Sequence, residues 1–128
     1  MHPCHNQVLG IVSKAKKMKL KVMGIDGLFD RYKQWSKSNN ARPYSILIIQ
    51  YIPDDQNTLP LSLLRARGWV VELVSSIRVI EFNPNNLNCD CIVVDYSRYD
   101  QIKKNSPLLL DEISIIKLFG FKGILVFI

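Results

Sequence analysis

The sequence predicts an α/β fold in which a doubly wound parallel sheet carries helices on both faces, in three layers. Four short runs rich in apolar and β-branched residues support this prediction, at residues 44–51, 69–74, 89–95 and 123–128. Runs that are apolar at nearly every position are typical of strands buried on both faces, as parallel strands are. Helical signals lie between the runs, and this alternation indicates an α/β sheet. The chain has 128 residues, 48% of them hydrophobic and 22% charged, so its composition fits one small globular domain.

The first predicted strand, residues 44–51, is flanked by prolines, which are disfavoured inside a buried strand. The helix predicted after it ends near residue 68. Thr58 can cap this helix, Pro60 is tolerated in its first turn, and Gly68 can end it. The second strand then begins at once, because apolar residues follow this glycine directly.

The second half of the chain continues the alternation. A short apolar segment at residues 77–82 is stopped by an asparagine-rich turn at residues 83–88. A second long helix is predicted from Ser106 to about residue 119, with Gly120 at its end. The third and fourth strands are the apolar runs on either side of this helix.

Positive charge is concentrated in the first third of the sequence. The formal net charge is +6, yet residues 1–45 contain nine Lys and Arg against two acids and therefore carry +7. We expect a basic, partly helical extension over residues 1–43, followed by an α/β domain over residues 44–128. The densest basic run is a solvated lead-in or a nucleic-acid contact surface, and its cations are Lys14, Lys16, Lys17, Lys19 and Lys21.

The sequence also bears on location and cofactors. It contains no apolar run long enough for a membrane helix and no secretory signal at residues 1–30, so we expect a cytoplasmic protein, with a nuclear location as the alternative. The three cysteines lack the Cys-x-x-Cys spacing of a zinc site, and no nucleotide-binding glycine motif occurs. We therefore expect neither a metal nor another cofactor.

The ends of two predicted strands carry a family resemblance. The strand 44–51 ends in Gln50 and Tyr51, two residues before Pro53, and the strand 89–95 ends in Asp95, 44 positions after Tyr51. With this spacing, residues 45–128 resemble the receiver domain of two-component response regulators, which has a flavodoxin-like fold. The resemblance covers about two-thirds of the chain.

The resemblance implies a phosphoacceptor pocket that has lost its chemistry. It places Asp95 at the phosphoacceptor position, and it places Gln50 and Tyr51 where the family has two acids that hold Mg²⁺. An amide and a phenol cannot supply the anionic oxygens that this hard cation prefers, so phosphoryl transfer should be lost. Two downstream carboxylates, Asp54 and Asp55, are the remaining metal-holding candidates.

The resemblance also implies an incomplete domain. The family's fifth strand and about two helices are missing after residue 128, so about four strands are expected. The strand 124–128 would then be an uncovered apolar edge, through which the chain could associate with itself.

The leading functional hypothesis is a non-enzymatic, receiver-like regulatory or protein-interaction domain of intracellular signalling, with a protein partner. One alternative is the N-terminal regulatory fragment of a signalling enzyme, such as a cyclic-nucleotide (cAMP) phosphodiesterase. Another is a nucleic-acid-associated protein that uses the basic run in its first third.

Overall fold

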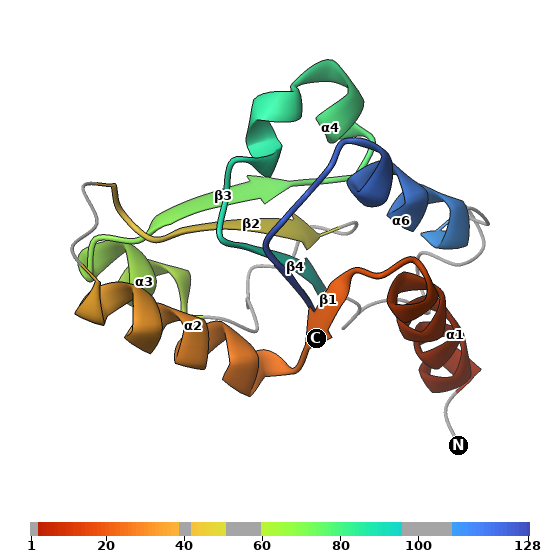
Figure 1. Cartoon of the computed structure of the whole chain (residues 1–128), viewed down its shortest axis with the longest axis horizontal. Helices are drawn as coiled ribbons and strands as arrows, with labels where there is room; N and C mark the ends of the chain where they lie inside the picture. The colour runs from red at the N-terminus through yellow and green to blue at the C-terminus, as the bar shows by residue number, and fades with distance from the viewer. Residues whose placement is uncertain (1–2, 39–41, 51–59, 96–108) are drawn as a thin grey trace.

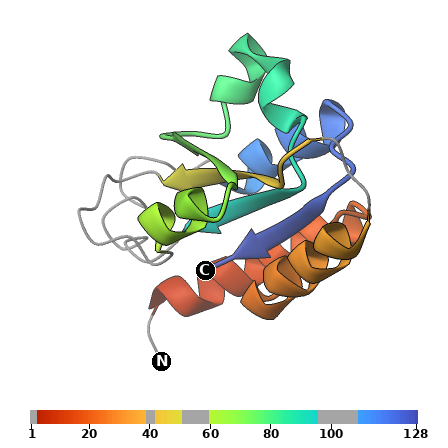
Figure 2. The ribbon, with the colours of Figure 1, turned by 90° about the vertical axis from the view of Figure 1, so that its left-hand side faces the viewer.

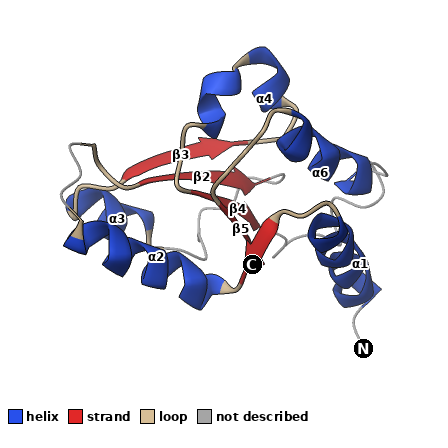
Figure 3. Cartoon of the chain, in the orientation of Figure 1, coloured by secondary structure: helices blue, strands red, loops and turns tan. Residues whose placement is uncertain are grey.

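The computed structural model describes residues 3–38, 42–50, 60–95 and 109–128. Helices and strands alternate along the described chain, as the colour gradient of Figure 1 and the red and blue elements of Figure 3 show. Their bounds are α1 Pro3–Lys17, β1 Lys21–Met23, α2 Ile25–Lys37, β2 Ser45–Gln50, α3 Leu61–Ala66, β3 Val70–Val74, α4 Val79–Phe82, the 3₁₀ helix η1 Pro84–Leu87, β4 Cys91–Asp95, α6 Leu109–Leu118 and β5 Ile124–Phe127.

The strands form a single five-stranded sheet in the order β1-β5-β4-β2-β3, and every neighbouring pair is parallel. The predicted doubly wound α/β fold is confirmed. The four predicted strands are β2, β3, β4 and β5, and each begins one or two residues later than predicted. Among the described residues, no helix is long and apolar enough to cross a membrane.

Helices cover both faces of the sheet, which gives the three predicted layers (Figure 2). Alternate residues of a strand point to opposite faces, so β2 sends Leu47 and Ile49 into one core and Ile46 and Ile48 into the other. Side chains from α1, α4 and α6 complete the first core, and side chains from α2 and α3 complete the second.

The number of strands predicted from the sequence is wrong, because β1 supplies a fifth. Lys21 pairs with Ile124, and Val22 pairs with Leu125. Strand β5 therefore lies between β1 and β4, and the prediction that the strand 124–128 forms an uncovered edge is also wrong. The edges of the described sheet are β1 and β3. Residues 1–43, which were predicted to be an extension, thus contribute a strand to the sheet and one helix to each of its two faces.

Counted from β2, the sheet is a permuted version of the flavodoxin-like order 2-1-3-4-5. Strands β3-β2-β4-β5 occupy the first four places of that order, and β1 occupies the fifth although it comes first in the chain. The resemblance of residues 45–128 to receiver domains covers only four strands because the strand in the fifth place, β1, precedes these residues in the chain.

Three helices end in the same hydrogen-bonded turn. After α1, α3 and α6, the residue in the left-handed conformation is Lys19 (φ 67°), Gly68 (φ 89°) and Gly120 (φ 76°), respectively. In each turn, the next residue donates its backbone N–H to a carbonyl five positions earlier, as Leu20 does to Ala15 at 3.1 Å. This pattern is the Schellman motif. The glycine stops predicted from the sequence are confirmed, and the first turn uses a lysine where the others use glycine.

Candidate functional site

The two strand ends singled out in the sequence lie side by side at the carboxyl edge of the sheet. Gln50 is the register partner of Asp95 across the β2–β4 ladder. From β2 the chain crosses to β3 on one side and then to β4 on the other, so the strand order reverses between β2 and β4. Doubly wound sheets bind their ligands at such a reversal, outside the carboxyl ends of the strands. Asp95 is buried, with 6% of its surface exposed, and Gln50 is half-buried.

Of the five pocket candidates, the structure places only these two. Tyr51, Asp54 and Asp55 lie outside the described residues. The residue beside Asp95 on β2 supplies a neutral amide where a Mg²⁺ site needs a second anionic oxygen. Within the described segments, no group of three His, Cys, Asp or Glu side chains is placed to hold a metal ion.

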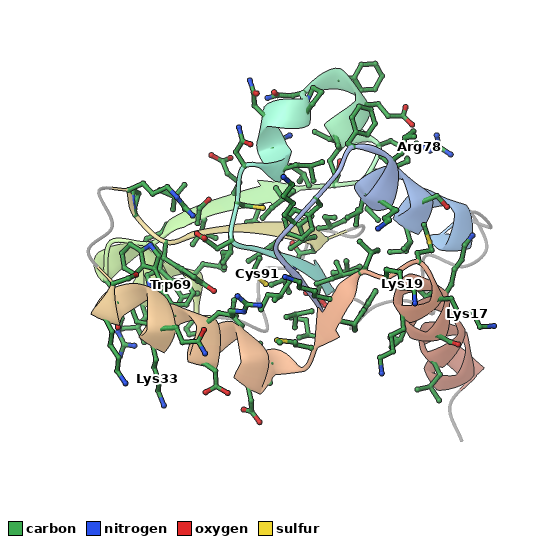
Figure 4. All side chains as sticks on the ribbon, in the orientation of Figure 1. Lys17, Lys19, Lys33, Trp69, Arg78 and Cys91 are labelled. Carbon is green, nitrogen blue, oxygen red and sulfur yellow. The ribbon has the colours of Figure 1, made fainter. Side chains whose placement is uncertain are left out.

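The lysine run spans the end of α1 and the start of β1. Lys16, Lys17, Lys19 and Lys21 are exposed, whereas Lys14 is half-buried. Figure 4 shows Lys17 and Lys19 on the side of the molecule formed by α1. These lysines are part of the folded unit, because β1 pairs with β5 and because Ala15 and Leu20 are buried in the core.

Cys89 and Cys91, the cysteines whose side chains the structure describes, are inert thiols. Burial raises the pKa of Cys89 to about 12, and it raises the pKa of Cys91 still further. Both thiols are therefore protonated at neutral pH and are poor nucleophiles and metal ligands. The two thiols lie on opposite sides of the sheet, because β4 begins at Cys91 and Cys89 precedes it. Cys91 lies in the core beside α2 and α3, whereas Cys89 packs against the opposite core.

A second concave site, absent from the sequence predictions, lies at the opposite edge of the sheet. It is a cleft of about 430 Å³ at the amino ends of β2, β4 and β5. One wall is a single face of α2, because Arg31, Gln34, Trp35 and Ser38 follow one another at helical spacing. The other wall is made by the residues that lead into the strands, which are Arg42, Tyr44, Cys89, Asp90, Lys122 and Gly123.

Aromatic stacking holds the α2 wall in place. The rings of Tyr32 and Trp35 stack with centroids 5.9 Å apart, and the Trp35 ring lies 5.8 Å from that of Tyr44. Tyr44 is buried and donates its hydroxyl hydrogen to the Leu28 carbonyl at 3.2 Å. Burial raises the pKa of Tyr44 well above its ordinary value, so its hydroxyl is neutral. Trp69 extends this aromatic cluster toward α3, as Figure 4 shows.

The single acid in the cleft is neutralised. Asp90 accepts hydrogen bonds from both terminal nitrogens of Arg42, at 2.9 and 2.6 Å, and from the backbone N–H of Ser45 at 2.9 Å. Burial opposes ionisation of Asp90, but these hydrogen bonds and the Arg42 charge outweigh it and hold the pKa below its ordinary value. The Asp90 carboxylate is thus occupied by partners of its own chain.

The carboxyl edge was found from sequence because its residues end two apolar runs. The cleft was missed because its walls come from residues 31–44, 89–90 and 122–123, which only the folded chain brings together. The helical spacing of its α2 residues was the one available signal. No protein-family model matches the chain, and neither the curated proteins nor the solved structures yield a match.

Proposed function

We propose that the chain is a non-catalytic, receiver-like domain that works in regulation by binding a protein at the carboxyl edge of its sheet. The observation that carries the proposal is the pairing of Gln50 with Asp95 at the point where the strand order reverses. The position favours ligand binding, while the residue types disfavour phosphoryl transfer.

The chemical reason is charge. An incoming phosphoryl group carries negative charge that a Mg²⁺ ion must offset, and that ion needs anionic oxygens close to the acceptor carboxylate. Gln50 provides a dipole and no charge. Among the residues that the structure describes, Asp95 is the buried carboxylate of this edge, and one carboxylate beside a neutral amide suits recognition of a donor group on a partner better than it suits catalysis.

The first experiment separates recognition from catalysis. The chain is incubated with Mg²⁺ and acetyl phosphate and then weighed by intact-mass spectrometry. We expect no gain of a phosphoryl group. The variant Gln50→Asp should gain Mg²⁺-dependent amide NMR shifts at Asp95, because it restores a carboxylate beside the acceptor. A phosphoryl adduct on the unmodified chain that Asp95→Asn removes would overturn the proposal.

The second experiment addresses the docking edge. Proteins retained from a cell extract by the immobilised chain are compared with those retained by Gln50→Arg and by Lys33→Glu. Lys33 is exposed on α2 and points away from the sheet (Figure 4), so its variant is the control. We expect Gln50→Arg to lose a retained protein that Lys33→Glu keeps. Equal retention by all three chains would contradict docking at this edge.

A second candidate function is nucleic-acid binding through the exposed lysines of α1 and β1. Four exposed cations within six positions, Lys16 to Lys21, are the observation in its favour. Phosphate contacts release counterions, so the affinity for a DNA or RNA oligonucleotide should fall steeply with salt. The triple variant Lys16→Gln, Lys17→Gln, Lys21→Gln should flatten this dependence, whereas Lys33→Gln and Lys37→Gln should leave it unchanged. Salt-independent binding, or no binding at low salt, would exclude this function.

A further inference from the structure

The cleft at the amino edge of the sheet has the size of a small-ligand site. Its volume, about 430 Å³, lies in the range of roughly 300–1,000 Å³ that is usual for such sites. Its lining combines a held aromatic wall, Trp35 and Tyr44, with the polar side chains of α2. An aromatic wall can pack against a flat ring, and the polar groups around it can fix the orientation of that ring.

Charge in the cleft is unbalanced. Of the described residues that line it, three are cations, Arg31, Arg42 and Lys122, and one is an acid, Asp90. Arg42 and Asp90 neutralise one another through two hydrogen bonds. Neither Arg31 nor Lys122 has a hydrogen bond or an ion pair among the residues that the structure describes. Two positive charges are therefore available on opposite walls, one from α2 and one from the lead into β5.

The remaining polar groups do not offset this charge. The Cys89 thiol and the Tyr44 hydroxyl are neutral at physiological pH, because burial raises the pKa of both. Arg31 and Trp35 lie four positions apart on α2 and both line the cleft, so the guanidinium charge borders the aromatic wall. Arginine binds carboxylate and phosphate groups through paired hydrogen bonds, and lysine binds them as a point charge.

We propose that this cleft binds a small planar anion, an aromatic ring that carries one carboxylate or phosphate group. The ring lies against Trp35, and the anionic group lies between Arg31 and Lys122. The site is independent of the function proposed for Asp95, because it lies at the amino ends of the strands and Asp95 lies at a carboxyl end. The two proposals can therefore fail separately.

The test is a titration of the ¹⁵N-labelled chain followed by NMR. Adenosine 5′-monophosphate and benzoate are the planar-anion probes for the phosphate and carboxylate arms. Adenosine lacks the charge, and inorganic phosphate lacks the ring. We expect at least one planar anion to shift the Trp35 indole and Gly123 amide signals saturably while the Asp95 amide stays unchanged. Adenosine and inorganic phosphate should each bind at least about tenfold more weakly than the planar phosphate.

Charge variants then locate the anion. Arg31→Gln and Lys122→Gln should each weaken binding by about tenfold or more, because each removes a charge-assisted hydrogen bond. Lys33→Gln removes the same charge from the same helix outside the cleft and should change affinity by less than about twofold. Thermal unfolding of each variant shows whether it is folded, and the two cleft variants provide independent readings.

Three results would overturn the proposal. One is the absence of saturable shifts at Trp35 and Gly123 with both planar anions. Another is an equal loss of affinity in Lys33→Gln, which would indicate attraction to the net charge of the chain. The last is binding of inorganic phosphate as tight as that of the planar phosphate, which would remove the role of the ring.

Discussion

Asp90 binds Arg42 through two parallel hydrogen bonds, with the Nη1–Oδ2 and Nη2–Oδ1 atoms 2.9 and 2.6 Å apart. Asp90 is the more buried member of the pair, since its side chain is 17% exposed and that of Arg42 is 60% exposed. Asp90 also donates its N–H to the Ser45 carbonyl at 2.8 Å and accepts the Ile124 N–H at 3.2 Å. One residue thus joins the beginnings of β2, β4 and β5.

The two members of this pair should differ in their effect on stability. Asp90→Ala leaves the Ser45 N–H without its acceptor and should lower the free energy of unfolding by about 2–3 kcal/mol. Arg42→Ala removes an exposed cation and should cost less than about 1 kcal/mol. Urea unfolding followed by circular dichroism measures both. Equal losses would show that the ion pair, and not the backbone contact, carries the effect.

Acid should weaken the fold through Asp90. Its pKa is lower in the folded chain than in the unfolded chain, where an aspartate titrates near about 3.9. The ionised group therefore stabilises the fold above about pH 4, and this contribution is lost as the pH falls through the folded pKa. The free energy of unfolding should exceed that of Asp90→Asn at neutral pH, and the difference should shrink below about pH 4. A difference that stays constant with pH would contradict this assignment.

Lys19 should be replaceable by glycine with a gain in stability. A residue with a Cβ is strained in the left-handed conformation, and the equivalent turns after α3 and α6 use glycine. Lys19→Gly should raise the free energy of unfolding by about 1 kcal/mol. Lys17→Gly removes the same charge within α1 and should lower it by a similar amount. Thermal melts of the two variants should move in opposite directions, and a shift in the same direction would refute the explanation.

The N-terminal segment should be required for a complete, stable sheet. Removal of residues 1–38 uncovers the β5 edge and takes Leu28, Ile11 and Ala15 out of the cores. The shortened chain should unfold without cooperativity or associate through the bare edge, as measured by calorimetry and light scattering. Rejoining residues 3–38 after residue 128 through a flexible glycine–serine linker should restore a cooperative monomer. A shortened chain with unchanged stability would show that β1 is dispensable.

The sequence predicted the strands that are recognisable from local composition. The runs that became β2, β4 and β5 are apolar at nearly every position because both of their faces are buried. Strand β1 is different, since it is only Lys21–Met23, two of its three residues are exposed, and it lies at the end of a lysine run. Its pairing with β5 supplies its stability, and a contact between such distant residues leaves no local signal.

The candidate sites show the same contrast between features visible in the local sequence and features formed only by folding. Gln50 and Asp95 were found because each ends a strand, so that position in the sequence implies position at the sheet edge. Arg31 and Lys122 line the same cleft because β1 pairs with β5, so that α2, which follows β1, lies next to the start of β5. Arg31 and Lys122 lie 91 positions apart, and no helix or strand periodicity links residues at that separation. The cleft could be identified only from the fold.

The strand order has a consequence for how the molecule assembles in time. Among the strands of this sheet, β1 leaves the ribosome first, yet its partner β5 is synthesised about 100 residues later. Contacts between residues so far apart in sequence carry a large loop-closure entropy and slow folding. During synthesis, β1 therefore remains unpaired while β2, β3 and β4 are made, because its partner in the sheet is β5. Pairing of β5 with both β1 and β4 is therefore a late step, so the described sheet acquires its full width only after residue 127 has been translated.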